Sequence, residues 1–293
     1  MKNLDDKVLV AADGGGTGCR AAAGTFGNGI MARSAGGPGN VHSDFDEAIL
    51  NLVTAIDAAL QDAGLGDTPR DQITAHLGVA GAHSDVEMAA VERALPYGKC
   101  RVTGDRATSL RGALGDSDGY VVALGTGTIV ARQNALEMTT IGGWGFDLSD
   151  HASGSWLGHR LLREVLLAEE GLIAHTPLTR KAIQDKGGLL AVVYFSMDAA
   201  PGDYAPLARD VVAAAAQDDP IALQLMRDGA EFLELGLRTL GHKAGDKLVL
   251  TGGLGPHYAP YLAQHLTDCL IPPKGTALEG AFALAQQAAK TTV

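Results

Sequence analysis

The sequence predicts an α/β protein made of two layered domains, and three observations support this fold class. Short apolar runs alternate with amphipathic helical segments along the chain. An apolar run, a glycine-rich turn and a second strand follow one another twice, at residues 8–26 and 120–133. A length of 293 residues also favours two domains. We place them at residues 1–118 and 119–293, and the last helix, at about 278–290, can pack back onto the first domain.

Composition and charge exclude several classes of protein. The 23 Lys and Arg residues against 34 Asp and Glu residues give a net charge of −11 without a basic cluster, so we expect no nucleic-acid partner. The 39 glycines follow no three-residue period, which excludes a collagen-like chain. Three well-separated cysteines indicate neither a zinc site nor a disulfide framework. No apolar stretch approaches about 18 residues, so we expect a cytoplasmic protein that does not bind membranes.

The first half begins with a hairpin and continues as alternating helices and strands. Residues 8–12 form an apolar strand, Asp13 to Thr17 a glycine-rich tip, and residues 20–26 the returning strand. Apolar residues at three- and four-residue spacing predict a helix over 44–63, with Ser43 or Asp44 as its N-cap. The remaining elements of this half are strands at 76–80 and 100–103, separated by a helix near 85–95.

The second half repeats the hairpin and is then mostly helical. Strands at 120–124 and 129–133 flank the second turn, and residues 116–119 are a candidate domain boundary. The pattern predicts helices at 155–170, 204–216 and 220–240. Asp218 or Asp219 can cap the third of these, and Pro220 fits its first turn. A strand at 247–251 and a helix at about 278–290 complete the chain.

Both glycine-rich tips have the composition of an anion site. Glycines let backbone N–H groups approach an anion without a Cβ in the way, and a neighbouring hydroxyl adds a donor. One such tip is most simply a turn, but two of them about 110 residues apart, each after an apolar strand, favour phosphate binding. Neither is a P-loop or a dinucleotide fingerprint, because no lysine follows at the Walker spacing and a strand follows the glycines. The tips contain Gly14, Gly15, Gly16, Thr17, Gly125, Thr126, Gly127 and Thr128.

This combination resembles the actin-like ATPase and sugar kinase superfamily, and within it the BadF/BadG/BcrA/BcrD-type ATPase family. The resemblance implies two ribonuclease-H-like domains with a nucleotide cleft between them, and ATP bound by the two tips as phosphate hairpins. It also implies that Asp13 holds Mg²⁺, directly or through water, since hard carboxylate oxygens suit this ion. The late glycine pair then corresponds to an adenosine-binding element at Gly252, Gly253 and Leu254.

Asp105 follows the strand at 100–103 and has two interpretations. It can be the N-cap of a short helix over 107–112. The resemblance implies instead that Asp105 is the catalytic general base, and both roles are compatible. A carboxylate at a helix start lies at the positive end of the helix dipole, so we expect it to be ionised at neutral pH. It could then accept the proton of a sugar hydroxyl, a step worth roughly 10²- to 10⁴-fold.

Two loops rich in glycine and polar residues, 34–42 and 142–155, are candidates for a sugar pocket, although they could be ordinary connections. They resemble segments of the acetylglucosamine and glucosamine kinase branch, which implies sugar contacts by Asn40, Gly143 and Asp150 together with Asp105. Amide and carboxylate groups suit ring hydroxyls, and a carboxylate also suits a protonated amine.

Within this branch the details favour glucosamine. His151 stands where acetylglucosamine kinases commonly have an acidic residue. His151 itself is either a substrate contact or a solvated loop residue, and Trp144 either stacks on a sugar or packs in the core or in its loop.

The sequence therefore predicts a Mg²⁺- and ATP-dependent kinase that phosphorylates the 6-hydroxyl of glucosamine, a small-molecule amino sugar, and acts as a monomer or homodimer. An N-acetylglucosamine kinase is the alternative within the same chemistry. A signalling ATPase of the BadF/BadG type is a second class, but its members hold an iron–sulfur cluster by cysteines near 142–155, where this sequence has none. A nucleotide sensor without catalysis is the third, and the presence of both Asp13 and Asp105 disfavours it.

Overall fold

The computed structural model of the chain, which describes residues 3–135 and 137–290, is an α/β protein of two compact units. Unit 1 comprises the chain up to Ser117 together with the segment from Pro273 onward. Unit 2 is Asp118–Pro272. Each unit contains one β-sheet with helices packed against it, so the predicted fold class is confirmed.

The sheet of unit 1 has five strands in the order β3-β2-β1-β4-β5. The first three are antiparallel, while β4 and β5 run parallel to β1. The inner strands are rich in small apolar residues and mostly buried, which explains why they are visible as apolar runs. The strands are β1 (Val8–Gly14), β2 (Cys19–Thr25), β3 (Gly29–Gly36), β4 (Thr74–Val79) and β5 (Lys99–Gly104).

The sheet of unit 2 repeats this order with four strands, β8-β7-β6-β9. Again three antiparallel strands are followed by a parallel one. A single parallel bridge from Leu248 to Leu270 occupies the place of a fifth strand. The strands are β6 (Gly119–Leu124), β7 (Thr128–Asn134), β8 (Glu137–Gly142) and β9 (Leu248–Thr251).

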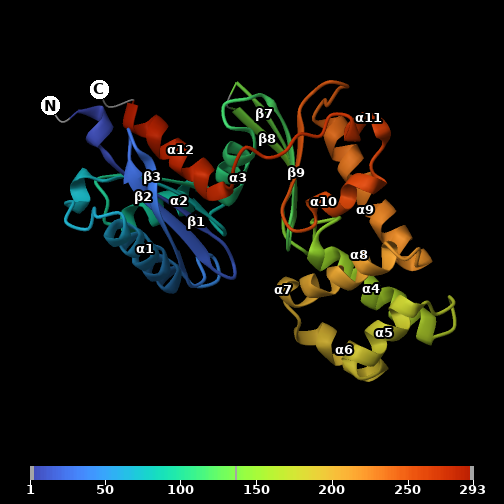
Figure 1. Cartoon of the computed structure of the whole chain (residues 1–293). Helices are drawn as coiled ribbons and strands as arrows, with labels where there is room; N and C mark the ends of the chain where they lie inside the picture. The colour runs from blue at the N-terminus through green and yellow to red at the C-terminus, as the bar shows by residue number, and fades with distance from the viewer. Residues whose placement is uncertain (1–2, 136, 291–293) are drawn as a thin grey trace. The chain divides into compact units, whose positions relative to one another are not determined.

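Helices cover both faces of the sheet in unit 1 (Figure 1). On one face, α1 (Phe45–Asp62) and α2 (Asp85–Ala94) bury Leu52, Ile56 and Val91 against the strands. On the other face, the C-terminal helix α12 (Ala277–Lys290) packs on β1 and lies beside α3 (Asp105–Leu114). The end of the chain therefore belongs to the same core as its beginning.

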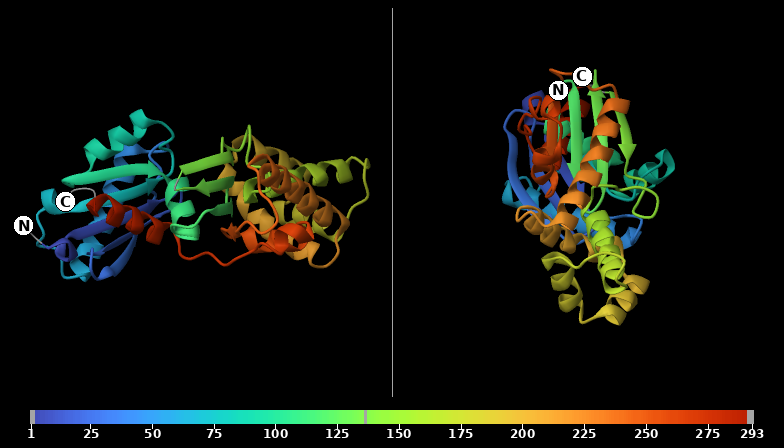
Figure 2. Two further views of the ribbon diagram at one scale, coloured as in Figure 1. Left: turned by 90° about the horizontal axis from the view of Figure 1, so that it is seen from above. Right: turned by 90° about the vertical axis from the view of Figure 1, so that its right-hand side faces the viewer.

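Unit 2 is largely helical outside its sheet. The long helix α9 lies against the strands, as the right-hand view of Figure 2 shows, and buries Leu233 and Leu237. The helices are α4 (Gly154–Glu169), α5 (Pro177–Lys186), α6 (Leu189–Asp198), α7 (Pro201–Tyr204), α8 (Ala208–Ala215), α9 (Pro220–Thr239), α10 (Gly255–Tyr258) and α11 (Gln264–Thr267). Short 3-10 turns lie at Leu4–Asp6, Arg70–Gln72, Ala205–Leu207 and Ala259–Tyr261.

Three local expectations need correction. The helix predicted over 204–216 is interrupted by a 3-10 turn at Ala205–Leu207, because Pro206 lacks the N–H that a continuous helix requires. Residues 34–36 of the first predicted loop belong to strand β3. Asp105 is not an N-cap: Gly104 takes that position, and Asp105 is the first residue of α3.

The predicted caps of two long helices are now assigned. Asp44 caps α1 by accepting a hydrogen bond from the backbone N–H of Glu47 at 3.0 Å. Asp219, rather than Asp218, caps α9 by accepting from the N–H groups of Ile221 and Ala222.

Two glycines allow α3 and α12 to cross closely. A Cβ on Gly280 would collide with the backbone of Thr108 and Gly112, and a Cβ on Gly112 would collide with the backbone of Thr276. We expect Gly280→Ala to lower the free energy of unfolding by about 1–3 kcal/mol, because backbone atoms cannot rotate out of the way. Urea unfolding measures the change. Gly202→Ala is the control, since a Cβ there meets no atom within 4 Å; equal effects of the two substitutions would contradict the prediction.

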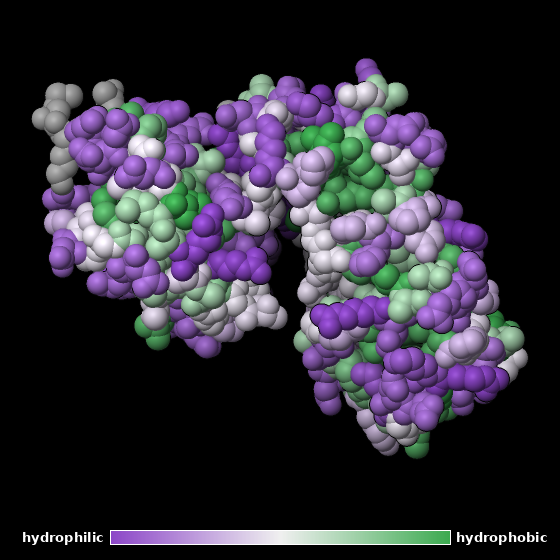
Figure 3. All heavy atoms as spheres, viewed as in Figure 1, coloured by the Kyte–Doolittle hydropathy of each residue, from purple (hydrophilic) through white to green (hydrophobic). Residues whose placement is uncertain are grey.

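Polar side chains cover most of the face drawn in Figure 3, with apolar side chains interspersed. Among the helices at residues 3–135 and 137–290, none is long and apolar enough to cross a membrane.

Candidate active site

Hairpin 1, the tip from Asp13 to Thr17 between β1 and β2, carries backbone N–H groups that are free to bind a ligand. The carbonyl of Gly15 accepts from the N–H of Gly39 at 2.9 Å. In a trans peptide the C=O and N–H point in opposite directions, so the N–H of Gly16 is directed away from Gly39. In the described part of the chain, the N–H groups of Gly16 and Thr17 meet no acceptor. A Cβ on Gly16 would enter open space, so this tip fits an anion such as a phosphate.

The loop that contains Asn40 packs directly on hairpin 1. A Cβ on Gly14 would lie 2.9 Å from the carbonyl oxygen of Gly39, so only glycine permits this approach. Asn40 lies against Gly81, and its Oδ1 accepts from the backbone N–H of His42 at 2.9 Å. Its side-chain NH₂ has no acceptor among the described residues and is the group available to a sugar hydroxyl.

Asp13 and Asp105 are two partly buried carboxyl groups that interact electrostatically in unit 1. Burial raises the pKa of Asp13, and the charge of Asp105 raises it further, while Arg20 lowers it. Burial also raises the pKa of Asp105, and this effect outweighs the nearby Arg106 and the backbone N–H groups at the start of α3. A carboxylate with a raised pKa is a stronger base than an ordinary aspartate.

The environment of Asp13 fits a divalent cation. A partly buried carboxylate beside a second carboxylate loses its electrostatic penalty when a cation binds. No group of three or more potential metal-ligating side chains occurs at residues 3–135 or 137–290, so the protein would supply few direct ligands. This matches Mg²⁺, which keeps several waters and binds through one or two carboxylates plus substrate phosphates.

Unit 2 has a second glycine hairpin like hairpin 1. Hairpin 2 comprises the turn at 125–127 between β6 and β7 together with Thr128. The N–H groups of Thr126 and Gly127 have no acceptor within the described residues, and a Cβ on Gly125 would meet nothing within 4 Å. The hydroxyl oxygen of Thr128 is buried and likewise has no partner there. These features also fit a phosphate.

The predicted adenosine element lies next to hairpin 2. Gly252 has a φ of 79°, and a Cβ there would collide with the carbonyl of Leu124, so the position requires glycine. The N–H of Leu254 donates to the same carbonyl at 3.2 Å. Its side chain is buried in the core of unit 2, so only the backbone of Leu254 is available to a ligand. Gly253 faces open space.

The second predicted sugar loop connects β8 to α4. Asp150 is 8% exposed, and its Oδ1 accepts from the backbone N–H of Thr128 at 3.2 Å. Gly143 has a φ of 71°, and Trp144 beside it is 74% exposed, so the indole is not packed in a core. His151 is not simply solvated, because its ring stacks on Phe232 with the ring centroids 4.8 Å apart.

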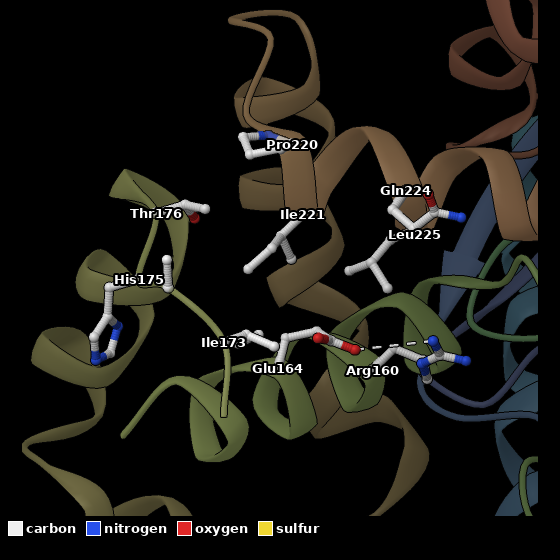
Figure 4. A pocket seen from close by; sticks show the side chains of 10 residues that line it. Arg160, Glu164, Ile173, His175, Thr176, Pro220, Ile221, Gln224 and Leu225 are labelled. Atoms are coloured by element: carbon white, nitrogen blue, oxygen red, sulfur yellow. Dashed lines mark ion pairs between the residues drawn. The ribbon is translucent and has the colours of Figure 1, made fainter. Parts of the chain in front are cut away.

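A hollow of about 380 Å³ lies elsewhere in unit 2 (Figure 4). The side chains of Ile173, Ile221 and Leu225 converge on it, and the ion pair of Arg160 with Glu164 lies along its wall. None of the residues that the sequence indicated for ATP or sugar lines this hollow.

Each unit thus has three antiparallel strands followed by a parallel one, with an open glycine hairpin between its first two strands. This duplicated arrangement defines a two-domain ATPase of the ribonuclease-H-like, actin-like class. The chain belongs to the BadF/BadG/BcrA/BcrD ATPase family, whose model matches residues 12–269. The resemblance noted in the sequence is therefore confirmed.

Relatives of known designation cover nearly the whole chain. Glucosamine kinase GspK of Vibrio cholerae is 28% identical over 280 residues, which are 94% of this chain and 95% of that protein. The N-acetylmuramic acid/N-acetylglucosamine kinase of Clostridium acetobutylicum is 24% identical and covers 80% of this chain and 79% of its own length. A crystal structure from Chromobacterium violaceum, designated an N-acetylglucosamine kinase, superposes with a TM-score of 0.88 at 31% identity, covering 96% and 99% of the two chains.

Proposed function

We propose that this chain is an amino-sugar kinase that transfers the γ-phosphate of ATP to the 6-hydroxyl of glucosamine. The observation that carries the proposal is the grouping of three features in unit 1: the hairpin with free backbone N–H groups, the partly buried carboxyl of Asp105 with its raised pKa, and the loop that contains Asn40. The similarity to glucosamine kinase GspK over 94% of the chain supports the choice of sugar.

The proposed roles follow from the chemistry of each group. The free N–H groups of hairpins 1 and 2 bind the phosphates of ATP, and the backbone of Gly252, Gly253 and Leu254 approaches the adenosine. Asn40, Gly143 and Asp150 hold the sugar. Asp105 accepts the proton of the 6-hydroxyl while that oxygen forms a bond to the γ-phosphorus and the bond to the ADP oxygen breaks. Asp13 holds Mg²⁺, directly or through water, and the ion supplies positive charge beside the phosphates.

A coupled ADP-release assay with glucosamine, N-acetylglucosamine, glucose and N-acetylmuramic acid tests the proposal. Glucosamine is expected to give the highest kcat/KM. If N-acetylglucosamine prevails, the alternative substrate that two of the relatives suggest is correct. If none of the four sugars releases ADP, the kinase proposal fails and the second class, a signalling ATPase, becomes the better candidate. A cytoplasmic location and a monomeric or homodimeric state stay predictions.

The raised pKa of Asp105 predicts the pH dependence of turnover. The base must be deprotonated, so kcat/KM falls as the pH drops through a pKa above the ordinary aspartate value. Because the positive charge of Arg106 lowers this pKa, Arg106→Gln should raise it and move the acid limb to higher pH. A pH series of kcat/KM measures the shift, with Arg93→Gln, an exposed residue of α2, as control. An acid limb that moved to lower pH in Arg106→Gln would contradict the assignment.

A further inference from the structure

Hairpin 2 is held by the segment that leads into α4. The backbone N–H of Gly154 donates to the carbonyl of Gly125 at 2.8 Å. The hydroxyl of Ser155, a residue with no exposed surface, donates to the carbonyl of Thr126 at 2.5 Å, and the backbone N–H of Ser155 makes a longer bond of 3.4 Å to the same oxygen. Both acceptors belong to the turn, so the start of α4 fixes the orientation of two consecutive peptide groups.

These bonds to the two carbonyls determine where the N–H groups of the turn point. The carbonyl of Gly125 shares its peptide with the N–H of Thr126, and the carbonyl of Thr126 shares its peptide with the N–H of Gly127. No cis peptide occurs in the part of the chain that the structure describes, so each N–H is directed opposite to its carbonyl and away from α4. These are the same two N–H groups that find no protein acceptor.

Asp150 holds the far end of the turn. Its Oδ1 accepts from the N–H of Thr128, and both carboxylate oxygens lie within 3.2 Å of where a Cβ on Gly127 would be. Asp150 keeps this position with a φ of 62°, a left-handed conformation that aspartate adopts as a single residue more readily than most side chains do. The hydrogen bond to Thr128 and the close approach to Gly127 therefore tie the Asp150 carboxylate to the backbone of hairpin 2.

We infer that Ser155 and Asp150 are positioning residues for ATP, which orient the peptide groups of hairpin 2 so that the N–H groups of Thr126 and Gly127 face the phosphates. The inference rests on the proposed function in one respect, that hairpin 2 binds phosphate. For Asp150 this role is additional to the proposed sugar contact. Ser155 has no other assigned role.

The test measures the Kd of Mg²⁺·ATP by calorimetry without sugar, in the full chain and four variants. Ser155→Ala and Asp150→Ala should each weaken binding about tenfold, the size of effect expected when a hydrogen bond to a charged group is impaired. Asp150→Asn should bind ATP like the unmodified chain, because its amide oxygen can still accept from Thr128. In the kinase assay, Ser155→Ala should raise the KM for ATP and leave the KM for glucosamine unchanged.

Ser153→Ala is the matched control. Ser153 is as buried as Ser155, and its hydroxyl caps α4 by accepting from the N–H of Trp156 at 3.1 Å. Among the residues that the structure describes, the Ser153 hydroxyl otherwise contacts the Ser155 hydroxyl at 3.1 Å and does not contact the hairpin. This variant should lower the Tm and leave the Kd of ATP unchanged.

Two results would overturn the inference. One is an unaltered Kd in Ser155→Ala and Asp150→Ala, and the other is equal weakening by Ser153→Ala, which would indicate a general loosening of α4. If Ser155→Ala does not fold, the Kd of ATP for Asp150→Ala is compared with that for Asp150→Asn, and equal values would overturn the inference. A chain that binds ATP but phosphorylates no sugar would disprove the kinase proposal while this test still applies; a chain that binds no ATP would disprove both.

Discussion

Asp105→Asn is expected to reduce kcat by roughly 10²- to 10⁴-fold while the Kd for ATP stays the same. An amide cannot accept the proton of the sugar hydroxyl, but it has the size of the carboxyl group and leaves hairpin 1 intact. The coupled assay gives kcat, and calorimetry gives the Kd. Asp67→Asn, at an exposed turn of unit 1, is the control and should retain full activity. Turnover near that of the unmodified chain would show that Asp105 is not the base.

Asp105→Asn should also increase the thermal stability of the folded chain at neutral pH. Burial raises the pKa of Asp105 in the folded chain above its unfolded value, so the folded state binds this proton more tightly. The associated stability is fully present below the unfolded pKa and is lost as the pH rises through the folded pKa. Asparagine carries no charge and avoids this loss, so the Tm of Asp105→Asn should exceed that of the unmodified chain at pH 7 and approach it in acid. A lower Tm at pH 7 would contradict the burial argument.

Asp13→Asn is expected to raise the Mg²⁺ concentration needed for half-maximal activity by about 10- to 100-fold, the usual cost of removing a group that holds a metal directly or through its water. The amide keeps an oxygen but loses the negative charge that attracts the ion. Initial rates over a Mg²⁺ series at saturating ATP measure the change. Asp62→Asn, at the exposed end of α1, is the control.

The outcome of the Mg²⁺ series separates two roles for Asp13. If the loss of activity in Asp13→Asn is restored by high Mg²⁺, the carboxylate acts through the ion. If Mg²⁺ dependence is unchanged and kcat alone falls, Asp13 does not hold the metal, and the proposal for this residue is wrong.

Much of the fold was predictable because its central strands and long helices bury continuous apolar patterns. The strands β1 and β6 are apolar over most of their length, β4 is entirely buried, and α1 and α9 have strong caps at Asp44 and Asp219. The edge strands β3 and β8 were not predicted, because each is paired on one side and partly exposed, so neither has the apolar alternation that marks a strand. Helices α5 and α6 were missed as well, since few of their residues are buried.

By itself the sequence determined the membership of a family of ATPases and supplied the candidate site residues: two glycine tips, the aspartates at 13 and 105, and the asparagine at 40. These depend on residue type and spacing, which folding does not alter. Only the tertiary structure decided which backbone N–H groups of the two tips have no hydrogen-bond acceptor in the described part of the chain. The carbonyl of Gly15 is bonded by Gly39 and that of Thr126 by Ser155, residues 24 and 29 positions away along the chain. Because such long-range hydrogen bonds fix the peptide orientations, no local pattern could show that N–H groups of both tips meet no acceptor in the described part of the chain, or that Ser155 holds one of the tips.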